Sequence, residues 1–128
     1  MRLPTLCVAG VLAIAGLGAA APTSALSQVE GGLWEISRTG ALPQRLCVAE
    51  PAALAQYEHR SASCTRSLIR EAGPAATIRY TCPGGGFGQS TITRLTPRSL
   101  RIETQGIADG APFQYRLQAR RIGNCPTH

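Results

Sequence analysis

Residues 64–82 read CTRSLIREAGPAATIRYTC, and each terminal cysteine of this stretch lies nine residues from Gly73. Gly-Pro is a turn signal, so a hairpin that turns at Glu71-Ala72-Gly73-Pro74 would place the sulfurs of Cys64 and Cys82 opposite each other. The spacing therefore predicts two antiparallel strands that are joined by a disulfide.

The same pairing brings Leu68 opposite Ile78 and Arg66 opposite Tyr80. Side chains alternate between the two faces of a strand, so these four residues share a face with the cysteines. A slip of one residue would send the apolar partners to opposite faces. The hairpin is therefore predicted to contain a Leu68–Ile78 core pair, with Arg66 over the ring of Tyr80.

A second hairpin is predicted around Asp109-Gly110, because both residues tolerate the positive φ of a two-residue turn. Ile102 then faces Leu117 on one side, and Glu103 faces Arg116 on the other. Apolar pairs on one face and an ion pair on the opposite face are typical of a half-buried antiparallel sheet.

The remaining segments extend this pattern. Residues 33–37 and 45–48 read as short strands, with Trp34 directed inward, and residues 90–95 read as another strand. Residues 50–57 form the one helical stretch, since proline suits the start of a helix and alanine and leucine follow it. The sequence predicts an all-β fold, mainly an antiparallel meander in a curled sheet or partial barrel, with one short helix.

The N-terminus has the pattern of a secretory signal peptide, with a basic start, a short apolar run and small residues near the cut site. Cleavage is predicted after Ala25 and not after Ala21, because a proline follows Ala21. Residues 1–25 are then the signal and residues 26–128 a single domain. A retained signal anchor is the alternative; after cleavage, no membrane span is expected.

Four cysteines remain in residues 26–128, and an even number in an exported domain predicts two disulfides. If Cys64 pairs with Cys82, the second bridge joins Cys47 to Cys125. Zinc sites require closely spaced ligand pairs, which these cysteines lack, so neither a metal nor a redox dithiol is expected.

All 13 basic residues are arginine, against seven acidic residues. Several arginines are predicted on or near an outward sheet face, which could bind an anionic ligand; they are Arg98, Arg101, Arg116 and Arg120. The alternative is an ordinary solvated face. Nucleic acid is not an expected partner, because the aromatic residues of these strands point inward.

No set of residues with a catalytic pattern emerges. His59 lacks a nucleophile in an elbow motif and is expected to end the helix as a solvated residue. The run Gly84–Gly88 is followed by a strand and by no lysine, so it is interpreted as a turn and not as a phosphate-binding loop. The carboxylates Glu30, Glu35 and Glu50 show no spacing that would pair them across a cleft. The chain is therefore predicted to be neither an enzyme nor dependent on a cofactor.

The chain resembles a family of small exported proteobacterial proteins with a domain of unknown function. The resemblance rests on the opening Gly32-Leu33-Trp34-Glu35, the spaced cysteines and the closing Arg121-Ile122-Gly123-Asn124-Cys125. It spans roughly residues 31–125. The resemblance implies a β-rich periplasmic domain and no reaction, ligand or catalytic residue.

The resulting hypothesis is a periplasmic, non-enzymatic binding or accessory module of the cell envelope, whose partner is an envelope protein or an anionic ligand. The alternative hypothesis is a secreted inhibitor of a lysozyme or protease that presents the loop Gly84–Gly88. Small disulfide-bonded frames suit inhibition because little conformational entropy is lost on binding.

Overall fold

The computed structural model describes residues 2, 10 and 25–127. The predicted signal cleavage concerns residues of which 1, 3–9 and 11–24 lie outside this description. The described chain forms one antiparallel sheet in the order β2-β1-β7-β6-β5-β4-β3, which does not close. Its strands are β1 (Gly32–Ser37), β2 (Gln44–Val48), β3 (Thr65–Ala72), β4 (Ala75–Thr81), β5 (Phe87–Thr96), β6 (Ser99–Ala108) and β7 (Ala111–Gly123). The predicted all-β fold with one short helix is confirmed.

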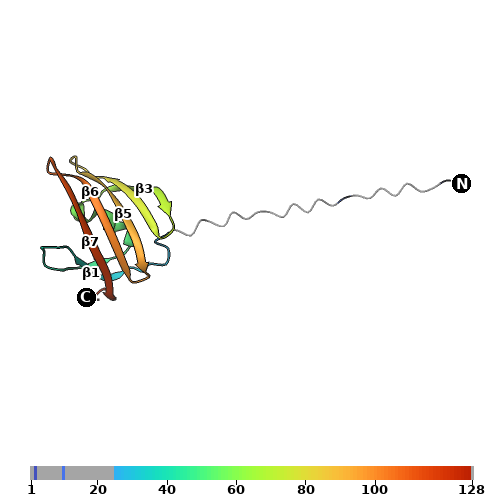
Figure 1. Cartoon of the computed structure of the whole chain (residues 1–128), viewed down its shortest axis with the longest axis horizontal. Helices are drawn as coiled ribbons and strands as arrows, with labels where there is room; N and C mark the ends of the chain where they lie inside the picture. The colour runs from blue at the N-terminus through green and yellow to red at the C-terminus, as the bar shows by residue number, and fades with distance from the viewer. Residues whose placement is uncertain (1, 3–9, 11–24, 128) are drawn as a thin grey trace.

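The sheet is curved, and strands β5, β6 and β7 run across its middle (Figure 1). The 3₁₀ helix η1 (Pro51–His59) connects the two edge strands β2 and β3. It packs against β4, β5, β6 and β2. Leu54 and Tyr57 are buried on this helix, as their spacing predicts. The helix is tighter than an α-helix and is interrupted at Gln56, which has a non-helical ψ of 34°.

The core lies between the concave face of the sheet and η1. Trp34 and Ile36 are 0% and 1% exposed, which confirms their predicted inward orientation. Ile92, Ile102 and Leu117 supply the middle of the same face and are fully buried. Alternation thus leaves one apolar face and one polar face, as the period of a strand requires.

The central hairpin β6–β7 has the predicted register throughout. Ile102 pairs with Leu117, and Glu103 pairs with Arg116. Asp109 and Gly110 have φ values of 51° and 76°, which is the double positive φ that the turn requires.

The edge hairpin β3–β4 keeps the predicted pairing at Arg66–Tyr80 and Leu68–Ile78, but a register shift follows at Ile69. The turn is therefore shorter than predicted, with Ala72 opposite Ala75. The predicted core pair is wrong in one partner: Ile78 is 5% exposed, whereas Leu68 is 54% exposed. The reason is position, because the backbone of η1 packs against β4 but not against β3, where Leu68 lies.

Arg66 also differs from the expectation. Instead of lying over the ring of Tyr80, its guanidinium donates to Gln56 Oε1 at 2.7 Å and lies 3.6 Å from a carboxylate oxygen of Glu50. The side chain therefore ties the start of β3 to the helix.

Both predicted disulfides are present. Cys64–Cys82 has a Cα–Cα distance of 4.2 Å, and Cys47–Cys125 has one of 5.4 Å. Two such bridges indicate an oxidising, extracellular compartment. In the described part of the chain, no helix has the length and apolar character needed to cross a membrane.

Candidate functional site

The side of the sheet opposite η1 is polar, and we call it the outer face. It consists of the outward positions of β1, β2 and β4–β7. The register of β5, β6 and β7 places three glutamines in a row across these strands: Gln89 pairs with Gln105, which pairs with Gln114. The adjacent row consists of Thr91, Glu103 and Arg116.

These two rows border a hollow of about 690 Å³. Thr39, from the connection between β1 and β2, also borders the hollow. Amide, hydroxyl, carboxylate and guanidinium groups therefore surround the hollow, and they can donate and accept hydrogen bonds. The lining residues are Thr39, Gln89, Thr91, Glu103, Thr104, Gln105, Gln114, Tyr115 and Arg116.

The predicted arginine set lies on or beside this face. Arg101, Arg116 and Arg120 occupy outward positions of β6 and β7, and Arg98 lies in the turn between β5 and β6. Arg116 lies 3.0 Å from Glu103, and Arg120 lies 3.6 Å from Glu35. Of the four, Arg116 borders the hollow directly.

Two further arginines of the outer face were missed by the sequence reasoning. Arg79 donates to Gln89 at 3.3 Å, and Arg45 lies 3.6 Å from Glu35. Their alternation with inward residues, such as Ile78 and Tyr80 around Arg79, was the available signal. The described outward positions of β1, β2 and β4–β7 carry five arginines and two carboxylates. The arginines are Arg45, Arg79, Arg101, Arg116 and Arg120, and the carboxylates are Glu35 and Glu103.

Arg101 has a distinctive environment among these arginines. It lies between Thr93 and Gln118 in the sheet. Its Nε atom is buried and has no hydrogen-bond partner among the described residues. The outer face therefore has a positive charge excess, and Arg101, near the start of β6, has a buried donor atom without a partner in the described chain.

A different cluster lies on the concave side, at the end of η1. His59 Nδ1 is 2.9 Å from the hydroxyl of Tyr80, and the His59 ring packs beside Phe113. His59 ends the helix as predicted, but the expectation of a solvated side chain is wrong, because the half-buried ring sits between aromatic neighbours. A Cβ on Gly86 would lie 2.4 Å from His59 Nε2, so the glycine run closes over this ring.

Two tyrosine hydroxyls in this cluster are held in the protonated form. Burial raises the pKa of Tyr80 to about 12, and the nearby charge of Glu58 adds to the effect. Burial also raises the pKa of Tyr115, and so does the hydrogen bond of 2.6 Å that its hydroxyl donates to Glu58. Arg38 lies 3.9 Å above the Tyr115 ring. Through these contacts, His59 and Glu58 tie the end of the helix to β4 and β7 of the sheet.

The three carboxylates considered for glycoside chemistry lie near different arginines. Glu35 contacts Arg45 and Arg120, Glu50 contacts Arg66, and Glu30 lies 4.0 Å from Arg121. Among the described residues, His, Cys, Asp and Glu side chains form no group of three that could hold a metal ion.

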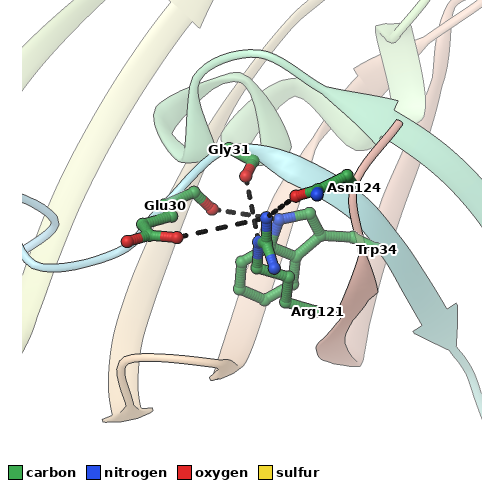
Figure 2. A network of polar contacts seen from close by, with 5 residues as sticks. All are labelled: Glu30, Gly31, Trp34, Arg121 and Asn124. Carbon is green, nitrogen blue, oxygen red and sulfur yellow. Dashed lines mark hydrogen bonds and ion pairs between the residues drawn. The ribbon is translucent and has the colours of Figure 1, made fainter. Parts of the chain in front are cut away.

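Arg121 joins the two ends of the described fold (Figure 2). Its Nε donates to the carbonyl of Gly31 at 3.0 Å, and its Nη2 donates to Asn124 at 2.7 Å. Trp34 donates from its ring nitrogen to the carbonyl of Glu30 at 3.3 Å. The opening and closing motifs of the sequence therefore meet at one structural junction.

A glycine is required at this junction. A Cβ on Gly32 would lie 2.6 Å from the carbonyl of Gly123 and 2.7 Å from Arg121 Nε. The Cys47–Cys125 bridge lies beside the junction, because Leu33 of β1 pairs with both Cys47 and Gly123. These motif residues thus support the junction of the two ends, and Glu35 also lies on the outer face.

A family described as "Protein of unknown function (DUF3617)" matches residues 29–125. The chain belongs to this family. The match includes all seven strands, the helix and both disulfides. No curated protein and no solved structure matches the chain.

Proposed function

We propose that this DUF3617 chain is a non-enzymatic binding module that holds an anionic ligand against its outer face. The observation that carries the proposal is the hollow of about 690 Å³ on a face where five arginines meet two carboxylates. The lining of the hollow holds one arginine and one carboxylate, Arg116 and Glu103, so the positive excess comes from the surrounding face. Such an excess of one sign attracts ligands of the opposite sign.

The side chains at the hollow favour one class of ligand. Glutamine amides and threonine hydroxyls both donate and accept hydrogen bonds, as the hydroxyls of a sugar chain require. Guanidinium groups bind carboxylates or phosphates in a planar, two-point geometry. An acidic glycan supplies both kinds of group along an extended chain, so we assign the outer face to such a polymer.

An envelope location fits this ligand. The two disulfides require an oxidising compartment, and the basic and apolar N-terminus has the pattern of an export signal. We therefore propose export to the periplasm.

The contacts of Ala25 bear on where the signal is cut. Ala25 is 3% exposed; its amide donates to Glu71 at 3.1 Å, and its carbonyl accepts from Arg94 at 3.1 Å. These contacts favour a cut on the N-terminal side of Ala25, so that this residue stays with the domain. The intact mass of the exported protein identifies its first residue.

The binding proposal is tested with polygalacturonate as a model acidic glycan and dextran as the neutral control. We expect the affinity for polygalacturonate to fall steeply between 50 and 500 mM NaCl, because exposed charges are screened. The double variant Arg101→Gln/Arg116→Gln should weaken binding roughly tenfold, which corresponds to about 1.4 kcal/mol.

The matched control is Arg60→Gln/Arg70→Gln, which also removes two positive charges but at positions that do not border the hollow. It should retain nearly the full affinity. Absent binding, binding that is insensitive to salt, or equal losses in the two double variants would contradict the proposal.

One observation favours a second candidate, inhibition of a hydrolase. The turn after Cys82 is anchored by the Cys64–Cys82 bridge and by a hydrogen bond of 2.8 Å from the Cys82 amide to the Gly86 carbonyl. Phe87 follows it and is 48% exposed. A panel of lysozymes and proteases tests this candidate, and a Phe87→Ala variant should lose any inhibition that the protein shows.

A further inference from the structure

A groove of about 570 Å³ lies on a different side of the molecule, between β2 and η1. We call it the seam groove, because it lies along an edge of the open sheet. Leu46 and Val48 of β2 line one wall, and Leu54 and Tyr57 of the helix line the other. Arg60 and Arg66 complete the lining where the chain leaves the helix for β3.

Strand β2 offers unpaired backbone groups beside this groove. It is an edge of the sheet and pairs with β1 on one side. In the described chain, no further backbone hydrogen bond joins residues 44–48 to another segment. An unpaired strand edge is a template for another strand.

The opposite edge is less suited to this role. Strand β3 has a register shift at Ile69 and carries Arg66 and Arg70, and such irregularities and charges protect an edge from pairing. Strand β2 is regular over its five pairs with β1. Its single arginine, Arg45, points to the outer face, where it contacts Glu35.

The charges around the groove indicate the chemistry of an occupant. Arg60 lies 4.5 Å above the Tyr57 ring, and its side chain is held there by a hydrogen bond of 3.0 Å to the Tyr57 carbonyl. Arg66 is partly exposed, and Glu50 is the one carboxylate that lines the groove with these two arginines. The balance is positive and favours an acidic group on the occupant.

We propose that the seam groove binds an extended acidic segment of a partner protein, which adds to β2 as an antiparallel strand. Main-chain hydrogen bonds to the free edge would provide affinity, and alternate side chains would provide specificity. Apolar side chains would enter between Leu46, Leu54 and Tyr57, and a carboxylate would meet Arg60 or Arg66. Since β2 has five residues, the segment spans about five residues, or roughly 17 Å at the rise of a strand. The proposal is independent of the ligand of the outer face.

The experiment uses the disulfide-bonded protein to select binders from a random heptapeptide library. We expect the enriched peptides to alternate apolar and acidic residues. Fluorescence anisotropy should show that they bind roughly tenfold more weakly to the double variant Arg60→Glu/Arg66→Glu than to the unmodified chain. N-methylation of alternate backbone amides in the peptide should abolish binding, and this readout needs no protein variant. Hydrogen exchange should show new protection in residues 44–48.

Two controls separate this proposal from its competitors. The outer-face variant Arg101→Gln/Arg116→Gln should bind the peptide normally, so failure of the glycan proposal and failure of this one are distinguishable. A dansyl-labelled fatty acid tests whether the groove takes a lipid instead. No enriched peptide, tolerance of N-methylation, or fatty-acid binding without protection of residues 44–48 would overturn the proposal.

Discussion

Two hairpins of this sheet, β3–β4 and β6–β7, were predicted by the same reasoning, yet they differ in outcome. In the central hairpin β6–β7, every predicted pair is present and the inward side chains of Ile102 and Leu117 are fully buried. In the edge hairpin β3–β4, the register shifts after Leu68, and that side chain is exposed. Pairing within a hairpin is a local property, whereas burial depends on what covers each strand, and η1 packs against β4 and β6 but not against the backbone of β3.

The largest expected effect concerns the disulfides that end each hairpin. Cys47–Cys125 follows β7 and spans 78 residues, whereas Cys64–Cys82 closes the edge hairpin and spans 18. By loop entropy, replacing both cysteines with serine should reduce the free energy of unfolding by about 4.5 kcal/mol for the long bridge and about 3 kcal/mol for the short one. Urea unfolding of the two double variants measures this order, and a greater loss from the short bridge would contradict it.

The second prediction compares one leucine from each hairpin. Leu117→Ala leaves a cavity in the middle of the core and should cost roughly 3 kcal/mol. Leu68→Ala removes the same atoms from an exposed site and should change stability by less than about 0.5 kcal/mol. Equal shifts in the urea midpoint would show that the edge hairpin is covered in solution.

The smallest effect concerns the tyrosines that each hairpin contributes to the cluster around His59. The pKa of Tyr80 is raised from 10.0 to about 12, so the folded state holds its proton where the unfolded chain has lost it. The stabilisation is therefore fully present below pH 10 and decreases as the pH rises from 10 toward 12. The pKa of Tyr115 is raised in the same direction.

The free energy of unfolding, measured by urea titration between pH 8 and 10.5, should fall as the pH rises. Tyr115→Phe and Tyr80→Phe should each make this fall shallower, whatever they do to stability at pH 8. The two variants should change the slope by similar amounts, because up to pH 10.5 both folded tyrosines keep their protons and only the unfolded chain titrates. An unchanged slope in both variants would contradict the assignment.

The candidate site was predictable in part. Alternation along β7 placed Arg116 and Arg120 outward with Arg101 nearby in the sheet, and the structure puts all three on the outer face. It did not predict the hollow, because Gln89, Gln105 and Gln114 come from three strands and meet only through their register. The seam groove was also beyond prediction, because it depends on where η1 lies beside β2.

The sequence by itself determined the strand periods, the turn at Asp109-Gly110 and the two cysteine pairings, because these depend on spacing and on residues with restricted backbone preferences. Only the tertiary structure decided that Leu68 is exposed, that His59 is enclosed by aromatic rings and that Arg121 joins the two ends of the fold. Each of these outcomes depends on contacts between segments that are distant in the sequence. The alternation of side chains says which residues share a face, but only the packing of the helix decides which part of that face is buried.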